Sequence, residues 1–381
     1  MKYYVIAGEA SGDLHGSNLI RALREKDPHA DIRCWGGDKM EAAGATLVRH
    51  YKDLAFMGFI EVLNNLGTIL RNIRFCKEDI TAYQPDVLIL IDYPGFNLRI
   101  AKWAKQQGFK IIYYISPQVW AWKENRVKLI KQCVDKMLVI LPFEKAFYQK
   151  WNYEVEYVGH PLVEVVEEYM NKEQERRNSE LQTSNLKLQT SNIIALLPGS
   201  RKQEILKKLP IMLEVTKRFP EYRFVVAKAP GLDEAFYSTL LAPYGNVSSV
   251  KDQTYSLLMQ AKAALVTSGT ATLETALFGV PEVICYKGNA LSYQIAKRLV
   301  NIKFIGLVNL IMDKEVMKEL IQADLTPGNL EKELDRLLND PEKQRQVKED
   351  YAALKTLLSQ GGNASANAAA SIHAFLHDSA K

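Results

Sequence analysis

The feature of this sequence that most constrains its fold is the alternation of short apolar runs with longer amphipathic segments. Such runs are continuous and rich in Val and Ile, and the segments between them have the length of helices. This pattern is typical of a parallel sheet whose two faces are covered by helices. It restarts in the second half of the chain, so the sequence predicts an α/β protein with two doubly wound halves. The clearest runs are YYVIA at 3–7, VLILID at 87–92, KIIYYI at 110–115, KMLVIL at 136–141 and IIALL at 193–197.

The same pattern sets the expected domain boundaries. We predict an N-terminal doubly wound domain at 1–165, a polar linker at 166–192, a second doubly wound domain at 193–355 and a terminal helical segment at 356–381. The linker carries the near-duplicate LQTSNLKLQTSN and few apolar residues, so it lacks the side chains that a core needs. We expect no chemistry in it.

Composition narrows the class of protein. The chain has 381 residues, 47% of them hydrophobic, and a formal net charge of +5, which allows large cores and suits an anionic substrate or membrane surface. Lys and Arg form no stripe interleaved with aromatic residues, so we expect no nucleic-acid partner. The four cysteines show no C-x-x-C spacing, and neither a leader nor a membrane-spanning run is evident. We therefore expect a cytoplasmic protein without a metal site.

A strand, a Pro-Gly-Ser turn and a helix follow one another in LLPGSRKQEI, residues 196–205. The N–H groups at a helix start carry partial positive charge, and Arg201 adds a planar fork of donors beside Ser200. This combination suits a pyrophosphate. A plain turn with a surface arginine explains the same residues equally well when they are taken alone.

A second turn of this kind lies in ALVTSGTATLETALFGVP, residues 264–281. Hydroxyl and N–H groups at the helix start again suit phosphate, and Glu274, about one turn further on, suits a ribose diol. A capped helix with a solvated Glu274 is the simpler alternative. Two such turns in one half favour a nucleoside-diphosphate site, whereas the lack of G-x-G-x-x-G, P-loop and Asp-x-Asp motifs disfavours NAD, P-loop hydrolysis and metal-dependent sugar transfer. The residues of this turn are Ser268, Gly269 and Thr270.

Acidic residues follow two strands of the first half. Asp92 comes directly after VLILI, where burial beside aromatic residues would raise its pKa and suit a general base. Capping of the next helix is the alternative role for Asp92. The turn AGEASGD, residues 7–13, carries Glu9 and Asp13. Carboxylates repel anions, so a ligand of this turn should present hydroxyls or amides.

Two segments carry apolar side chains in patterns that suit either a core or a lipid. YYISPQVWAWKENRV places Trp120 and Trp122 two apart in a Pro-bearing loop, which suits sugar stacking, acyl contact or membrane contact as well as core packing. FMGFIEVLNNLGTILRNIRFCK, residues 56–77, has a broad apolar stripe with basic residues near its end, which suits a membrane surface as well as a core. The stripe comprises Phe59, Leu63, Leu66 and Ile69, with Arg71, Arg74 and Lys77 beside it.

A set of motifs stands in order along the chain: AGEASGD, MGFIEVL, IDYPGFN, ISPQVWAW, LPFEKAFY, VGHP, LLPGSR, SGTATLE and the Asn of GLVNLI. Together they resemble the lipid-A-disaccharide synthase family over nearly everything except the polar linker. The resemblance implies a GT-B-type fold, with two Rossmann-like domains facing a cleft and C-terminal helices packing back. It also implies an inverting, metal-independent glycosyltransferase without a cofactor, which transfers 2,3-diacylglucosamine from its UDP conjugate to 2,3-diacylglucosamine 1-phosphate in lipid A biosynthesis.

The resemblance also implies roles for residues. Asp92 matches the family's proposed general base, Glu9 an active-site carboxylate and Asn309 a required asparagine. Relatives often carry a second aspartate where this chain has Gly95, so Asp92 stands alone in IDYPGFN. Donor-binding roles fall on Ser200, Arg201, Ser268, Gly269, Thr270 and Glu274.

The expected partners follow from the same resemblance. They are UDP-diacylglucosamine, a lipid monosaccharide phosphate, and an anionic membrane surface at the inner face of the inner membrane. A second copy of the chain, forming a homodimer, is a further candidate. Three alternatives stay open: another GT-B UDP-sugar transferase, a UDP-sugar epimerase, and a non-catalytic nucleotide-sugar binding protein, for which Asp92 would be dispensable.

Overall fold

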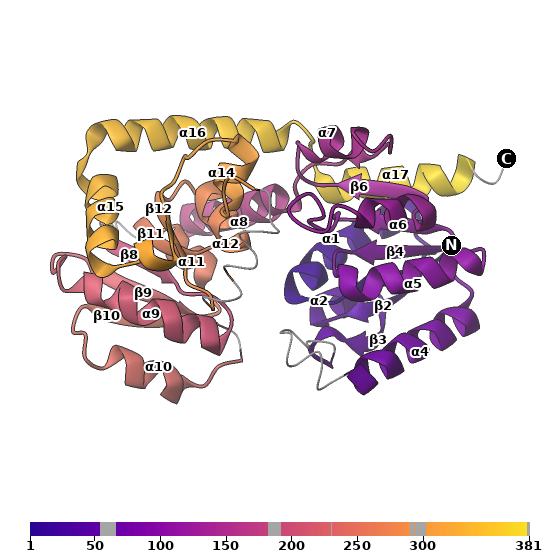
Figure 1. Ribbon diagram of the computed structural model, residues 1–381, viewed down its shortest axis with the longest axis horizontal. Coiled ribbons are helices and arrows are strands. Elements are labelled where there is room, and N and C mark those ends of the chain that lie inside the picture. The colour runs from indigo at the N-terminus through magenta and orange to yellow at the C-terminus, as the bar shows by residue number, and fades with distance from the viewer. Residues whose placement is uncertain (54–65, 182–191, 230, 290–292, 294–301, 379–381) are drawn as a thin grey trace. The chain divides into compact units, whose positions relative to one another are not determined.

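The computed structural model describes residues 1–53, 66–181, 192–229, 231–289, 293 and 302–378 (Figure 1). The chain forms two compact units, and the first of them draws on both ends of the chain. Unit 1 contains Met1–Pro161 and Leu358–Lys381, and unit 2 contains Leu162–Leu357.

Unit 1 is built on a parallel sheet whose described strands have the order β3-β2-β1-β4-β5-β6-β7. The apolar runs of the sequence form its central strands, which are buried because helices cover them. Alternate residues of these strands, such as Tyr4, Leu88 and Tyr113, pack in one cluster with α4, α5 and α6. The strands are β1 (Lys2–Ala7), β2 (Asp31–Gly36), β3 (Thr46–His50), β4 (Val87–Ile91), β5 (Ile111–Tyr114), β6 (Lys136–Val139) and β7 (Glu156–Tyr157). The helices are α1 (Ala10–Lys26), α2 (Asp38–Ala42), η1 (Tyr51–Asp53), α4 (Leu66–Tyr83), α5 (Pro94–Gln106), α6 (Arg126–Cys133), α7 (Glu144–Gln149) and α17 (Ala364–Asp378).

The terminal helix α17 packs on α1 and is tied to the end of the unit 1 sheet. Asn367 donates from Nδ2 to the carbonyl oxygen of Val158 at 3.1 Å, and Ser371 donates from Oγ to Glu156 at 2.6 Å. The apolar side of α17, including Ile372, is fully buried. The segment that the sequence pattern set apart as 356–381 thus contains the end of α16 and the helix α17, which is an integral part of the first unit.

Unit 2 repeats the architecture, with described strands in the order β10-β9-β8-β11-β12-β13. The predicted linker begins with α8, which lies in this unit, and residues 182–191 lie outside the described residues. The strands are β8 (Ile193–Leu197), β9 (Arg223–Lys228), β10 (Val247–Lys251), β11 (Ala261–Thr267), β12 (Glu282–Tyr286) and β13 (Glu319–Ile321). The helices are α8 (Pro161–Leu181), α9 (Lys202–Thr216), α10 (Glu234–Leu241), α11 (Thr254–Leu258), α12 (Thr270–Leu277), α14 (Leu307–Met312), η2 (Gln322–Asp324), α15 (Pro327–Asn339) and α16 (Pro341–Ser359).

Each sheet has a point where the strand order reverses. In unit 1, β1 lies between β2 and β4, and Ala7 pairs with Ile91. In unit 2, β8 lies between β9 and β11, and Leu197 pairs with Val266. The loops after such strands diverge to opposite faces, which leaves room for a ligand at the carboxyl edge.

Candidate active site

Asp92 lies at the reversal point of unit 1 in a strained backbone conformation. Asp92 and Tyr93 have φ angles of 42° and 48°, the left-handed region that side chains other than glycine rarely adopt. The Asp92 carbonyl oxygen accepts hydrogen bonds from Asn97 Nδ2, at 2.8 Å, and from the Tyr113 hydroxyl. Strain of this kind costs about 1–3 kcal/mol per residue and persists where surrounding contacts determine it, typically at functional sites. Burial, followed by the negative charge of Glu9, raises the pKa of Asp92 to about 7.

The two carboxylates of AGEASGD have different surroundings. Glu9 is the residue before α1 and is close enough to Asp92 to raise its pKa. Asp13 is buried and accepts hydrogen bonds from the backbone N–H groups of Gly37, at 2.8 Å, and Met40, at 3.0 Å. Asp13 therefore caps the start of α2, in addition to lying in the first turn of its own helix. Of the two carboxylates, Glu9 is therefore the one whose charge acts on Asp92.

Gly8 shows why this turn needs a glycine. A Cβ atom at Gly8 would lie 2.3 Å from the ring of Tyr93. The close approach lets the loop after β1 pack on the loop after β4. Glycine is therefore needed at this position so that the two loops can pack together, and not so that a phosphate can approach the backbone.

The two tryptophans after β5 have different environments. Trp120 is half-buried and meets the ring of Phe143 edge-on at 5.0 Å. Trp122 has 46% of its surface exposed, with the cations of Lys123 and Arg126 lying 4.2 and 5.7 Å from its ring centre. Trp120 packs within the fold, and Trp122 is the one available to an external apolar group.

Buried polar groups hold the loops that follow β5 and β6 in place. Glu144 is 1% exposed and accepts hydrogen bonds from the N–H groups of Ile140 and Leu141, at 3.2 and 2.9 Å. Burial raises the pKa of Glu144 to about 7. The hydroxyls of Ser116 and Tyr148 are 2.7 Å apart. These contacts fix the loops after β5 and β6 near their strand ends.

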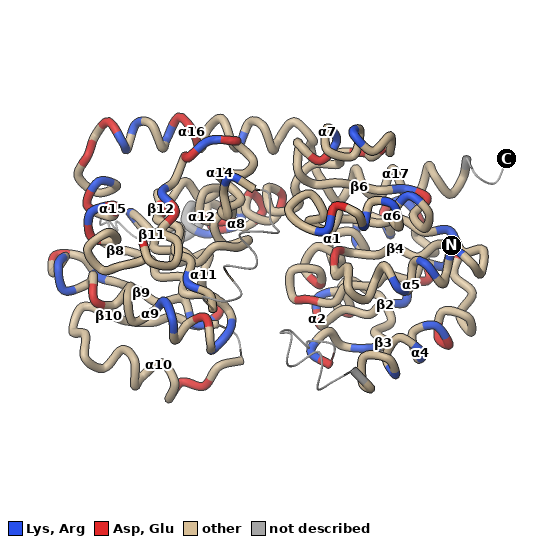
Figure 2. Tube along the Cα trace, in the orientation of Figure 1, with Lys and Arg blue, Asp and Glu red and all other residues tan. Residues whose placement is uncertain are grey.

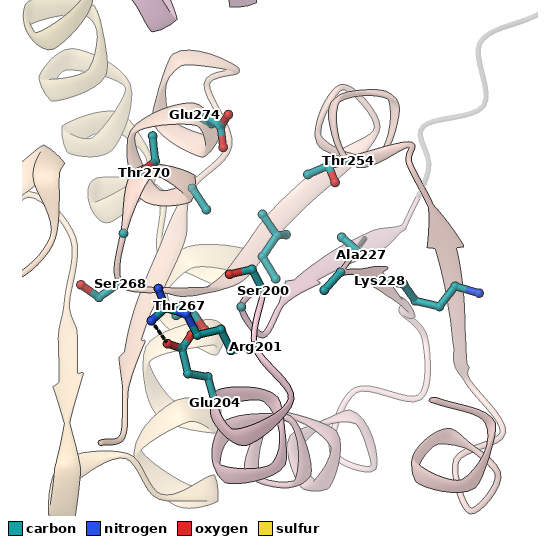
Figure 3. Close-up of a pocket in the computed structure, with 15 residues that line it drawn as sticks. Ser200, Arg201, Glu204, Ala227, Lys228, Thr254, Thr267, Ser268, Thr270 and Glu274 are labelled. Atoms are coloured by element: carbon teal, nitrogen blue, oxygen red, sulfur yellow. Dashed lines mark hydrogen bonds and ion pairs between the residues drawn. The ribbon is translucent and has the colours of Figure 1, made fainter. Parts of the chain in front are cut away.

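Unit 2 has a pocket of about 440 Å³ at its own reversal point (Figure 3). The two predicted phosphate-type turns, which follow β8 and β11, meet in it. Lys228 at the end of β9 and Thr254 at the start of α11 complete its wall. It is lined by Leu197, Gly199, Ser200, Arg201, Glu204, Ala227, Lys228, Ala229, Thr254, Thr267, Ser268, Gly269, Thr270, Ala271 and Glu274.

Arg201 is held by an ion pair within the first turn of α9. A dashed line in Figure 3 marks this ion pair, which joins Arg201 to Glu204. Arg201 Nη1 lies 3.1 Å from Glu204 Oε1, and the Arg201 side chain is 56% exposed. Glu204 Oε2 lies 3.7 Å from Nζ of Lys208, which is only 3% exposed. Burial lowers the pKa of Lys208 and the charge of Glu204 opposes that shift. Gly199, at φ +115°, lies so close that an added Cβ would be 3.0 Å from Glu204 Oε2.

The sequence analysis did not single out Glu204 or Lys208. Their positions, three and seven residues after Arg201, place all three on one side of α9, which was the available signal. Glu204 thus lies between two cations, Arg201 and the buried Lys208, beneath the Pro-Gly-Ser turn. Because Lys208 balances the charge of Glu204, the turn keeps the positive charge that Arg201 brings.

The turn after β11 is held in place by residues that do not line the pocket. Ser268 donates from Oγ to the carbonyl oxygen of Ile305 at 2.9 Å, and Gly269 is the residue that precedes α12. Glu274 accepts a hydrogen bond from the Tyr255 hydroxyl at 2.7 Å. Burial raises the pKa of Glu274, and the hydrogen bond from Tyr255 opposes that shift.

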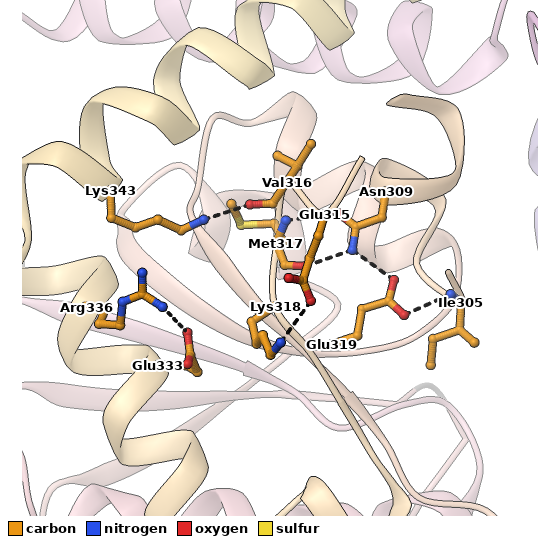
Figure 4. A network of polar contacts seen from close by, with 10 residues as sticks. All are labelled: Ile305, Asn309, Glu315, Val316, Met317, Lys318, Glu319, Glu333, Arg336 and Lys343. Atoms are coloured by element: carbon orange, nitrogen blue, oxygen red, sulfur yellow. Dashed lines mark hydrogen bonds and ion pairs between the residues drawn. The ribbon is translucent and has the colours of Figure 1, made fainter. Parts of the chain in front are cut away.

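Asn309, expected to be catalytic, has a different position. It is fully buried, and its amide donates to Met317 O at 2.7 Å and Glu319 Oε1 at 2.9 Å while accepting from Met317 N at 2.9 Å (Figure 4). Glu319 in turn accepts from the N–H of Ile305 at 2.9 Å. The amide of Asn309 is therefore already engaged inside the fold, and it is linked through Glu319 and Ile305 to Ser268. Its expected catalytic role stays a prediction.

The predicted lipid-facing stripe is only partly described. Phe59 and Leu63 lie outside the described residues, and for Leu66 only its place at the start of α4 is described. Ile69 is half-buried and packs against the core of unit 1, so part of its side chain is a core contact, and its expected lipid contact stays a prediction. A broad stripe contains both core-facing and outward positions, and Leu70, 58% exposed, is outward.

The distribution of charged residues and the apolarity of the helices also bear on whether the protein contacts a membrane. Figure 2 shows basic and acidic residues interspersed within each unit. Within the described ranges, no helix combines the length and apolarity that crossing a bilayer requires.

The fold defines a class of protein, that of chains with a GT-B-type fold built from two parallel-sheet α/β units. The structure is similar to the UDP-GlcNAc 2-epimerase of Neisseria meningitidis, with a TM-score of 0.65, 13% identity and coverage of 94% of this chain and 100% of that one. It is equally similar to the glycotransferase of kitacinnamycin, with a TM-score of 0.63, 15% identity and coverage of 98% of both chains. At such identities these likenesses establish the fold alone.

The particular family comes from the sequence comparisons. The family model of lipid-A-disaccharide synthetase matches residues 3–373. The lipid-A-disaccharide synthase of Geobacter metallireducens is 40% identical over 363 residues, covering 94% of this chain and 93% of its own. That of Syntrophus aciditrophicus is 39% identical over 367 residues, covering 94% of both chains. The chain belongs to the lipid-A-disaccharide synthetase family and is a glycosyltransferase.

The network in Figure 4 predicts the effect of replacing Asn309. Asn309→Ala leaves the Met317 N–H and the Glu319 carboxylate short of a partner, and an unsatisfied buried polar group costs about 1–3 kcal/mol. We expect urea denaturation to show a fall of that size in the free energy of unfolding. Asn339→Ala, at an exposed position on α15, is the control. Loss of turnover with unchanged stability and unchanged UDP affinity would instead indicate a direct catalytic role.

Proposed function

We propose that this chain transfers 2,3-diacylglucosamine from its UDP conjugate to 2,3-diacylglucosamine 1-phosphate, with inversion at the anomeric carbon and release of UDP. The observation that carries the proposal is the family match over residues 3–373, which includes both reversal-point sites. The donor's uridine diphosphate occupies the pocket of unit 2. Mass analysis of a reaction of the two lipids should show a disaccharide and UDP. A parallel incubation with UDP-GlcNAc, followed by chromatography that separates the epimers, tests the epimerase alternative, which epimerised UDP-GlcNAc without any disaccharide from the two lipids would favour.

In this mechanism Asp92 accepts the proton of the acceptor's primary hydroxyl as that oxygen attacks the anomeric carbon. A carboxyl group with a pKa near the working pH is suited to this role, because it is ionised enough to act and basic enough to accept a proton. Glu9 accepts hydrogen bonds from sugar hydroxyls or amides and its charge keeps Asp92 basic. The single carboxylate in IDYPGFN suffices, since Gly95 is exposed and has no part in the step.

The departing pyrophosphate acquires negative charge in the transition state. Arg201 turns from Glu204 to the pyrophosphate when the donor binds, and the N–H and hydroxyl groups of Ser200 and Thr270 donate to its oxygens, while Ser268 holds the second turn through its hydrogen bond to Ile305. Glu274 accepts from the ribose hydroxyls. Donors fixed in advance cost no reorganisation when the bond breaks, which is why the pocket favours the transition state.

The pH dependence tests the role of Asp92. The base acts when deprotonated, so turnover should be low below pH 7, rise through about pH 7 and level off above it. Glu9→Gln removes a negative charge that raises this pKa and should shift the rise to lower pH. Asp92→Asn should lower kcat by about 100- to 10,000-fold, with UDP binding changed only a few-fold in calorimetry. Glu78→Gln, at an exposed position on α4, is the control, and near-normal turnover of Asp92→Asn would refute the assignment.

Replacement of Arg201 should affect the donor. A charge-assisted hydrogen bond is worth about 1.5–3 kcal/mol, so Arg201→Ala should weaken UDP binding by about 10- to 100-fold and lower kcat/KM at least as much. Lys207→Ala removes an exposed cation from the same helix and should change UDP affinity little. Equal effects of the two replacements would mean that the pocket responds only to overall charge.

We propose further that the protein binds peripherally to the inner face of the inner membrane, where both acylated substrates reside. Trp122 with its two neighbouring cations and Leu70 on α4 combine apolar surface with positive charge. The association as a homodimer stays a prediction, which light scattering can check.

Vesicle sedimentation tests the membrane contact. The protein should sediment with phosphatidylglycerol vesicles at low salt and be released in part at high salt, since salt screens the charges. Leu70→Ser with Trp122→Ser should reduce binding and raise the KM for acylated substrates. Leu206→Ser, at a 47% exposed position in unit 2, is the matched control. Undiminished binding of the double variant would place the contact elsewhere.

A further inference from the structure

One hydrogen bond in unit 2 joins the pocket to a residue outside its lining. Glu274, on α12, lines the pocket. Its Oε1 accepts a hydrogen bond from the hydroxyl of Tyr255, on α11, at 2.7 Å. Burial raises the pKa of Tyr255, so this hydroxyl is protonated at neutral pH and acts as the donor. The direction of the hydrogen bond is therefore from tyrosine to carboxylate.

The ring of Tyr255 is held by an aromatic cluster. Its centre lies 5.0 Å from the ring of Phe278 and 5.3 Å from that of Tyr169, which it meets edge-on. The rings of Tyr169 and Phe278 are also in contact, at 6.1 Å. Three segments contribute, namely α8, α11 and the residue after α12, and edge-on and tilted contacts of this kind favour one ring orientation. These ring contacts thereby hold the hydroxyl of Tyr255 in one position.

A carboxylate can accept about four hydrogen bonds through its two oxygens. Tyr255 takes one position on Oε1 of Glu274, which leaves the other positions of this pocket-lining carboxylate for a ligand (Glu274 is labelled in Figure 3). A vicinal diol presents two O–H donors side by side, which match two carboxylate oxygens held in one plane. An unsupported glutamate would lose side-chain freedom on binding such a diol, whereas a carboxylate fixed in advance has already lost it.

We propose that Tyr255 is a positioning residue that fixes the Glu274 carboxylate for the 2′ and 3′ hydroxyls of the donor's ribose, and so makes the pocket selective for ribonucleotides. This inference rests on the proposed function, in which Glu274 binds the ribose. It adds a residue that touches no substrate and yet sets the preference for one sugar.

Calorimetric titration of the full-length protein with UDP and with 2′,3′-dideoxy-UDP tests the proposal. The unaltered protein should bind UDP about 10- to 100-fold more tightly, the range for hydrogen bonds to a charged group. Tyr255→Phe retains the ring and removes the hydroxyl. It should weaken UDP binding by about three- to tenfold and leave dideoxy-UDP binding unchanged within twofold. Tyr169→Phe, in the same aromatic cluster, should change neither affinity.

The outcomes separate the two proposals. If the unaltered protein binds both nucleotides equally, the assignment of Glu274 to the ribose fails. If it prefers UDP and Tyr255→Phe retains the full preference, the role of Tyr255 fails while that of Glu274 stands. Equal weakening for both nucleotides would mean that the hydroxyl only maintains the pocket, which also overturns the proposal. The affinity of Tyr255→Phe for dideoxy-UDP also reports whether the variant keeps its folded pocket.

Discussion

Parallel pairing of the strands is the constraint on which both candidate sites depend. In a parallel sheet every carboxyl end lies at the same edge, and the reversal of strand order beside β1 and β8 opens that edge to a ligand. The pairing of Ala7 with Ile91 brings Glu9 and Asp92 to one edge. A shift of one residue in this register would turn each side chain of the strand to the opposite face. The chemistry of the molecule therefore depends on the register of buried, apolar strands.

The two units use this one topology for opposite electrostatics. In unit 1 the reversal point carries Glu9 and Asp92, and burial raises the pKa of Asp92 toward neutrality. In unit 2 it carries Arg201 and the buried Lys208, with Glu204 between them. Burial strengthens the effect of Glu9 on Asp92, because charges interact more strongly where water is excluded. One unit is thereby suited to accept a proton and the other to receive a negatively charged leaving group.

Buried polar groups away from the ligands keep these loops in place. Asn97 and Tyr113 hold the strained carbonyl of Asp92, and Asn309 acts through Glu319 on the loop that contacts Ser268. Each such hydrogen bond contributes about 0.5–1.5 kcal/mol, so several together offset the strain of left-handed residues. The geometry of both candidate sites therefore depends on residues that line neither of them.

The sequence by itself determined the fold class, the two phosphate-type turns and the position of Asp92 after its strand, because these follow from the local spacing of apolar, glycine and polar residues. It did not determine the burial of Asn309, whose partners lie eight and ten residues away on another element, or the inward direction of Ile69. Nor did it show that α17 packs on unit 1 through contacts such as that of Asn367 with Val158. Periodicity shows that a helix has an apolar side, but only tertiary packing decides what that side contacts, because burial depends on residues distant in the chain.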